Sequence, residues 1–218
     1  MAFPFLTIFM IFIIFLFFRF STLRKKQDEK INNFWDHEYD AEHTPARDIS
    51  NLPYIKVPLS NFPLDKWDDD EIRMIEDSIR SLSEKRILNL TGKTNTELKL
   101  EYGTANLNVM SEIGENFNDL AVLLTDYGKA LMQKGDFESA ANVFEYGASI
   151  KSDVSSNYML LGDCYIALHQ ERKLNTIKEQ VQSMHLLLEH KIISYLDSLV
   201  PNTEDFEMSH EPIDSEES

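Results

Sequence analysis

The sequence predicts an all-α protein in which a single N-terminal transmembrane helix precedes a helical body. Three observations predict this class. The chain opens with residues 2–18, which carry no charge and are almost all Phe, Ile, Leu or Met. From residue 67 onward, apolar residues recur every three or four positions, the spacing of an amphipathic helix. Finally, a helix–turn–helix pattern around Gly128 repeats 34 residues later around Gly162.

The overall charge limits the classes of partner. The chain has 37 acidic and 21 basic residues and a formal net charge of −16. Nucleic-acid binding needs a basic face that neutralises phosphates, so this balance argues against a nucleic-acid partner. It also argues against a body that lies flat on anionic lipid. The single cysteine, Cys164, has no second thiol to pair with, and we expect it to be a buried structural thiol.

The apolar run at the amino terminus predicts a retained membrane anchor over residues 1–23. Residues 2–18 are just long enough to span a bilayer if the helix extends past Arg19. No base precedes the run and no small-residue cleavage site follows it, which argues against a signal peptide. Basic residues follow directly at Arg19, Arg24, Lys25, Lys26 and Lys30. The positive-inside rule therefore predicts an outside amino terminus and a cytoplasmic body. The alternative is an uncleaved export anchor with the body outside.

Residues 24–67 are predicted to be a juxtamembrane segment followed by a proline-rich linker. Residues 27–39 can form a short polar helix. His37 and His43 lie too far apart for the zinc-protease motif, so we expect a solvated face here. Four prolines favour extended backbone from residue 44 to 65. Apolar residues alternate along this segment, which predicts that it lies in a groove of the body; a free linker is the alternative.

The helical domain is predicted over residues 68–200. Its first helix covers residues 67–82, with Asp68 as the N-cap. Short helices are expected over 83–90 and 95–102. The sequence Gly92-Lys93-Thr94 lacks the second glycine of a phosphate-binding loop, so no nucleotide site is expected.

The four following helices are predicted over residues 115–134, 137–150, 152–169 and 170–184. The first pair carries small and large residues at Leu124, Tyr127, Gly128, Leu131, Gly135, Phe137, Ala140, Phe144 and Ala148. The second pair repeats part of the pattern at Tyr158, Leu161, Gly162 and Tyr165. With its 34-residue period, the stretch from about residue 121 to 188 resembles the tetratricopeptide repeat. The second copy departs from that pattern, since Leu174 replaces the usual Ala and Lys178 replaces the usual aromatic residue.

The repeat resemblance implies stacked helical hairpins with a concave protein-binding surface. A last helix over residues 185–200 is expected to cap the open side of the final hairpin, because an uncovered repeat face is apolar. Residues 201–218 contain seven acids and no base, which predicts an acidic disordered tail.

A second resemblance covers the stretch before the repeats. The residues that carry it are Ile87-Leu88-Asn89-Leu90-Thr91-Gly92, Asn95-Thr96, Leu98-Lys99, Tyr102-Gly103 and Ala105-Asn106-Leu107. With them the chain, over about residues 50–190, resembles an uncharacterised group of bacterial membrane-anchored helical-repeat proteins. That resemblance implies the same anchor-plus-repeat layout and brings no activity with it.

No residue constellation in the sequence predicts catalysis. We therefore expect no enzymatic activity, no cofactor, no metal and no small-molecule substrate. The leading hypothesis is a membrane-anchored interaction module or adaptor that binds a protein or peptide. Helix phase places Asp126, Lys129, Asn157 and Asp163 in its partner groove. The alternative is a structural membrane scaffold that associates with itself.

Overall fold

The structure is a computed structural model. It describes the backbone of residues 4–200 and, within the first helix, the side chains of residues 9–20, 24, 27 and from 29 onward. Over this part of the chain it contains α-helices and short 3-10 helices and no strand, which confirms the predicted all-α class. The chain forms two compact units: unit 1 comprises Met1–Leu52 and Gly92–Ser111, and unit 2 comprises Pro53–Thr91 and Glu112–Ser218. The predicted acidic tail, residues 201–218, lies outside the described residues.

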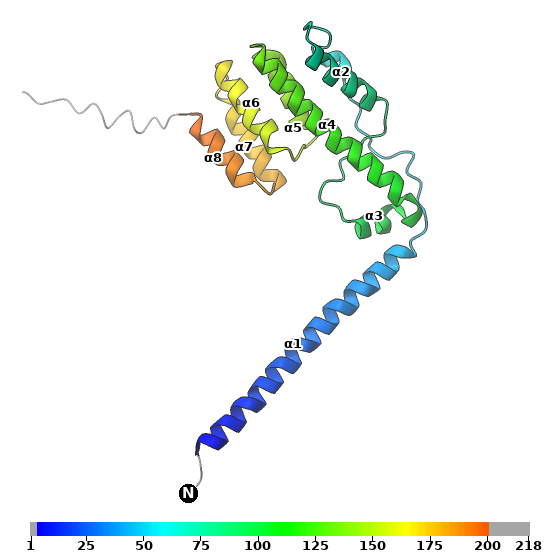
Figure 1. The fold of residues 1–218 in the computed structure, drawn as a ribbon, viewed down its shortest axis with the longest axis vertical. Coiled ribbons are helices and arrows are strands. Elements are labelled where there is room, and N and C mark those ends of the chain that lie inside the picture. The colour runs from blue at the N-terminus through cyan, green and yellow to red at the C-terminus, as the bar shows by residue number, and fades with distance from the viewer. Residues whose placement is uncertain (1–3, 201–218) are drawn as a thin grey trace, which may run out of the picture. The chain divides into compact units, whose positions relative to one another are not determined.

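Helix α1 of unit 1 runs from Pro4 to Glu42 without a break (Figure 1). Residues 27–39 are helical, as predicted, but they continue α1 and do not form a short helix of their own. The change from apolar to polar composition does not interrupt the helix because no Pro or Gly occurs between residues 5 and 44. Among the described residues, no helix is long and apolar enough to cross a membrane. The first residues of the predicted anchor lie outside that set.

Helix α3, Asn95–Tyr102, packs against the carboxyl end of α1 in unit 1. Thr94 caps α3 by accepting a hydrogen bond from the Glu97 amide, and the Glu97 side chain reaches back to the Thr94 amide, so a capping box sets the start. Thr96 and Lys99 on α3 bind Glu38 and Glu42 on α1, respectively. The predicted helix over residues 95–102 is thus confirmed, and its polar face is used to hold α1.

Gly103 ends α3 and lies close to the backbone of Pro45. Its φ of +89° lies in the region that favours glycine, and a Cβ there would lie 2.3 Å from the carbonyl oxygen of Pro45. The Arg47 amide donates to the Tyr102 carbonyl at 3.0 Å, and the Thr104 amide donates to the Thr44 carbonyl at 3.3 Å. The chain that leaves α1 is therefore bound along its backbone to the end of α3. The 3-10 helix η2, Thr104–Asn106, follows.

Unit 2 begins with an extended segment that packs on the body, as predicted for this part of the linker. The Ile55 amide donates to the Ile87 carbonyl at 2.8 Å, and the Tyr146 hydroxyl donates to the Lys56 carbonyl at 3.3 Å. Phe62 is buried, just after the short 3-10 helix η1, Leu59–Asn61. Residues 53–64 therefore belong to the core of unit 2 and do not form a free tether.

Helix α2 spans Asp70–Ser83. Its N-cap is Asp69, one residue later than predicted; the Asp69 carboxylate accepts from the amides of Glu71 and Ile72 at 3.0 and 3.1 Å. The predicted helix over residues 83–90 is wrong. Beyond α2 this stretch is not helical; its Ile87 carbonyl accepts from the Ile55 amide, and the Ile87 side chain is buried.

The remaining helices follow one another closely. They are α4, Leu107–Gln133; α5, Phe137–Ser149; α6, Ser155–Ala167; α7, Lys173–Met184; and α8, Glu189–Ser198. Helix α4 starts eight residues earlier than predicted, because the 3-10 helix η2 leads directly into it. Helix α5 packs on α6, and α8 packs on both α6 and α7. Helix α6 begins three residues later than predicted, with Val154 at the N-cap and no side chain capping it.

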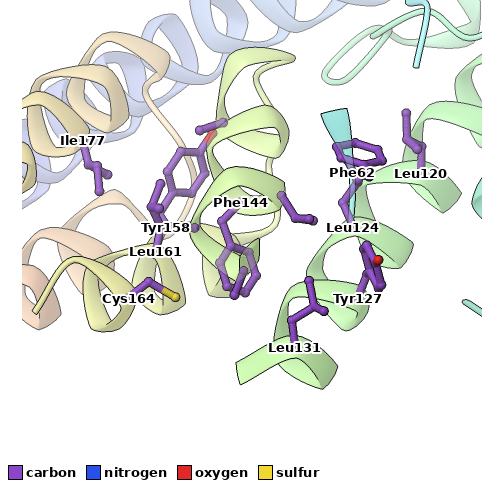
Figure 2. Packing of buried hydrophobic residues seen from close by; sticks show 14 of the residues in the cluster. Phe62, Leu120, Leu124, Tyr127, Leu131, Phe144, Tyr158, Leu161, Cys164 and Ile177 are labelled. Carbon is purple, nitrogen blue, oxygen red and sulfur yellow. The ribbon is translucent and has the colours of Figure 1, made fainter. Parts of the chain in front are cut away.

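The core of unit 2 gathers large side chains from these helices (Figure 2). Tyr127, Phe144, Tyr158 and Leu161 are each at most 1% exposed. Gly128 allows α4 to approach α5, since a Cβ on it would lie 2.4 Å from the Phe144 ring. Cys164 is a buried free thiol, as expected, and burial raises its pKa to about 12.

Candidate functional site

A groove in unit 2 runs between helices α2 and α4. It consists of two hollows. The first hollow, ≈ 650 Å³, is lined by Asp77, Ser78, Ser81, Leu82, Lys85, Asp119, Val122 and Leu123. The second hollow, ≈ 580 Å³, is lined by Glu71, Met74, Ile75, Asp126, Lys129, Ala130 and Gln133. The start of α2 faces the end of α4, so the two helices run in opposite directions along the groove.

The two hollows are related by a shift of seven residues on both helices. On α2, Glu71, Met74 and Ile75 of the second hollow correspond to Ser78, Ser81 and Leu82 of the first. On α4, Asp119, Val122 and Leu123 of the first correspond to Asp126, Lys129 and Ala130 of the second. Seven residues are two helical turns, so each helix presents one continuous face to the groove. At 1.5 Å per residue the hollows repeat about 10 Å apart.

Exposed apolar side chains lie in both hollows. Met74 is 71% exposed and Val122 is 49% exposed. Beyond residue 43, the other large apolar side chains recorded as exposed are Leu187, Leu188 and Val200, which lie next to α8. Each hollow therefore presents one exposed apolar side chain. Leu82 and Ala130 form the buried floor.

The charged residues of the groove are mostly acidic. Asp77 and Asp126 are neutralised locally: Arg80 lies 2.9 Å from the Asp77 carboxylate, and Lys129 lies 3.0 Å from that of Asp126. Glu71 and Asp119 are exposed, and neither forms an ion pair with a residue that the structure describes. Glu71 lies in the second hollow and Asp119 in the first. Each hollow therefore offers one acidic group to a partner.

Buried polar contacts fix the two walls of the groove. Glu76 of α2 is fully buried, and its carboxylate accepts from the Tyr127 hydroxyl of α4 at 3.0 Å and from the Asp65 amide at 3.0 Å. A buried carboxylate is tolerated only with such partners, so the pair fixes the position of α2 on α4. Burial, followed by the bond to Glu76, raises the pKa of Tyr127 far above its usual range. The tyrosine therefore stays a hydrogen-bond donor at every physiological pH.

A second contact holds the end of the groove. Lys134, after α4, lies 2.7 Å from the carboxylate of Asp69 at the start of α2. The bond from Lys134 and the amide of Ile72 hold the pKa of Asp69 below its ordinary value. The groove is thus built on rigid helices with fixed ends, which favours a surface that keeps its shape.

Another pair of hollows flanks Glu145 on α5. One lies beside Pro58 and Phe62, and the other lies between α5, α6 and α7. The Glu145 carboxylate already accepts from the Tyr165 hydroxyl at 2.6 Å and from Lys173 at 3.0 Å. The charge of Glu145 is therefore already paired within the protein, whereas Glu71 and Asp119 form no ion pair with a described residue.

The structure separates the four residues predicted to form a partner groove. Asp126 and Lys129 both line the second hollow. Asp163 accepts a hydrogen bond from the Tyr195 hydroxyl at 2.7 Å and so binds α8. Asn157 is fully buried and donates to the Phe144 carbonyl at 3.0 Å, which removes it from any exposed surface. Helix phase alone placed Asn157 outward, whereas the close packing of α5 on α6 covers it.

The wall that α2 contributes was missed by the sequence analysis. The core stripe of α2 consists of Ile72, Ile79 and Leu82, which are buried, with the half-buried Ile75 beside them. The neighbouring stripe at Glu71, Met74, Ser78 and Ser81 repeats with the same spacing. The same seven-residue repeat on α2 and α4 is the feature of the sequence that could have indicated this second wall. Comparison with known proteins adds no further guide, since no family model matches this chain and no significant match is found among curated proteins or solved structures.

Proposed function

We propose that the protein is a membrane-anchored interaction module whose α2–α4 groove binds a partner protein. The observation that carries this proposal is the pair of hollows along α2 and α4, with Met74 exposed in one and Val122 in the other. The internal contacts of Glu76 and Asp69 support it, since they keep the groove open and rigid. In this proposal the protein performs no catalysis and takes no cofactor or small-molecule substrate.

The anchor is part of the same proposal. The uncharged run of residues 2–18 supports it, together with the exposure of every large apolar side chain recorded between Phe9 and Ile14, around the whole helix. A helix that is apolar on all sides is suited to lipid. The bases that follow favour a cytoplasmic body. A reporter fused after Ser218 and active on one side of the membrane tests the orientation; an outside signal would reverse the compartment.

We also propose that α4 to α8 form a tetratricopeptide-like array with α8 as its cap. The 34-residue offset between Gly128 and Gly162 supports this proposal, as does the packing of α8 on α6 and α7. In such an array the concave side carries the binding surface. Asp126 and Lys129 of the groove lie on its first helix.

Site-specific photo-crosslinking in cells tests the groove. A photoreactive amino acid is placed at Met74 or at Val122, with matched control positions at Glu138 on α5 and Asn175 on α7, both exposed. We expect a crosslinked partner from the groove positions and none from the controls. The substitutions Ser78→Trp and Ser81→Trp fill the first hollow from exposed positions and should abolish the crosslink. Equal crosslinking from groove and control positions would refute the proposal.

The alternative is a self-associating membrane scaffold, which the exposed apolar side chains of α1 also favour. Light scattering of the full chain in detergent micelles separates the two. A monomer with a heterologous crosslinked partner supports the interaction module. A defined oligomer whose crosslinks join two copies of the chain supports the scaffold.

A further inference from the structure

We infer that the groove is shaped for one amphipathic α-helix of a partner, with large apolar side chains at positions i and i+7 and basic residues beside them. This inference rests on the proposed function and deepens it by naming the chemistry of the partner. It follows from the shift of seven residues between the hollows and from the charges at their rims.

The spacing argues for a helix as the occupant. On a helical partner, positions i and i+7 lie on the same face and about 10 Å apart along the axis. The two hollows are repeated by the same seven residues on α2 and on α4. A third helix in this groove would bury its apolar stripe between two walls, as in helix-in-groove recognition. An extended peptide places side chains on one face every two residues and has no period that matches seven.

The depth of the hollows indicates where the large side chains of the partner lie. In the first hollow the small side chains Ser78 and Ser81 leave space above the buried Leu82. In the second, Ala130 leaves space beside Ile75. Small residues on the walls let large side chains of a partner enter, which is the knob-into-hole relation of packed helices.

The rim charges favour a basic partner. Asp119 and Glu71 lie one in each hollow, and neither forms an ion pair with any residue described. Lys129 is paired with Asp126 at 3.0 Å, which leaves Lys85, beyond the end of α2, as the other base of the lining. The chain as a whole has a net charge of −16. An acidic helix would be repelled both by the rim and by the overall field.

The test uses the full chain in detergent micelles and three synthetic helical peptides of equal length. The first peptide has leucines at i and i+7 flanked by lysines. The second has the same leucines flanked by glutamates. The third has the same flanking lysines, but its leucines are five residues apart and so lie on different faces of the helix. Fluorescence anisotropy gives the affinity of each, and light scattering of the same samples reports whether a second copy of the chain fills the groove.

We expect the first peptide to bind about tenfold or more tightly than the other two. The double variant Glu71→Lys and Asp119→Lys should reverse the preference between the first and second peptides. The matched control, Glu138→Lys with Glu179→Lys, changes the net charge equally at exposed positions on other helices and should keep the preference. Because all four residues are exposed, these variants should fold.

Several outcomes would overturn the inference. Equal binding of the first and third peptides would show that the i and i+7 spacing of the leucines does not matter. An unchanged preference in the double variant would show that Glu71 and Asp119 do not select a basic partner. No peptide binding at all, or a dimer that is lost with Ser78→Trp, would reject a basic partner helix as the occupant. Crosslinks from Met74 and Val122 to another protein would still support the proposed function in each of these cases, so the two failures are distinguishable.

Discussion

The hairpins α4–α5 and α6–α7 each carry a glycine in the first helix, Gly128 and Gly162, 34 residues apart. Different side chains fill the space beside these two glycines. In the first, the Phe144 ring of α5 lies where a Cβ on Gly128 would come within 2.4 Å. In the second, Leu196 and Leu199, from α8 and its C-cap, occupy the equivalent space, at 2.5 and 2.9 Å from a Cβ on Gly162. The first hairpin is therefore closed by its own second helix, whereas the second is closed mainly by α8, with Leu174 of its own second helix farther away at 3.5 Å.

The residue 34 positions after Phe144 explains the difference. It is Lys178, which lies 2.5 Å from Asp197 of α8 and contributes a charge where the first hairpin has a ring. Helix α8 supplies both the leucines that replace the ring and the carboxylate that pairs with the lysine. A hairpin can thus lose its aromatic residue and keep its glycine if the next helix supplies the missing apolar surface.

The largest difference between the hairpins should appear when the two equivalent side chains are truncated. Phe144→Ala removes a fully buried ring and should lower the free energy of unfolding by about 3–5 kcal/mol. Lys178→Ala removes a partly exposed ion pair and should cost only about 0–1 kcal/mol. Urea unfolding of both variants, followed by circular dichroism, measures the two values. Similar losses would contradict the assignment of different roles.

Truncation of the leucine that closes the second hairpin should come next. Leu196 is fully buried, so Leu196→Ala should lower the free energy of unfolding by about 2–5 kcal/mol. The loss should be local. Hydrogen exchange should speed up in α6 and α8 and stay unchanged around Gly128. Faster exchange around Gly128 as well would show that the two hairpins are not closed independently.

The substitutions Gly128→Ala and Gly162→Ala should lower the free energy of unfolding by smaller amounts, and the two amounts should differ. Gly128→Ala presses on a buried ring and should cost about 1–3 kcal/mol. Gly162→Ala should cost less, because the ends of two leucine side chains on the last helix can move aside. Adding Phe144→Leu should recover part of the Gly128→Ala loss. A double-mutant cycle measures this coupling, and additive losses would argue against direct contact.

The smallest effect concerns the polar contact between α6 and α8. The hydrogen bond to Asp163, with burial second, raises the pKa of Tyr195 to about 12. Asp163→Ala should lower that pKa toward the ordinary value of about 10. Tyr146 is the matched control, since burial alone raises its pKa to about 12. Tyrosine ring carbon resonances followed through the alkaline range measure both groups, and a parallel fall at Tyr146 would point to general loosening.

Much of the fold could be predicted from local sequence. The acidic run before Ile72 placed the start of α2 within a few residues, and the Thr94–Glu97 capping box marks α3 directly. The failures came from non-local effects. Ile87 and its neighbours look helical by composition, yet the Ile87 carbonyl bonds to the distant Ile55 amide and the stretch is not helical. No local pattern predicts that pairing.

Only one of the two walls of the candidate site, the wall formed by α4, could be predicted from the sequence. Helix phase gave Asp126 and Lys129, because α4 is long and regular. The wall formed by α2 depends on the antiparallel packing of two helices that lie far apart in the sequence, and the contact between Glu76 and Tyr127 that fixes it spans 51 residues. The prediction that Asn157 lines the groove was wrong, because a polar side chain was assumed to face water and this one is fully buried.

The close approach of Gly103 to Pro45 has a mechanical consequence. The end of α1 is bound to α3 and its following turn by backbone bonds at Arg47 and Thr104 and by the ion pair between Lys99 and Glu42. These bonds lie side by side across unit 1, so a pull along α1 would load them together before the chain beyond residue 48 is stretched. Tension applied to α1 would therefore reach α3 and the turn after it through these contacts at Lys99, Tyr102 and Thr104.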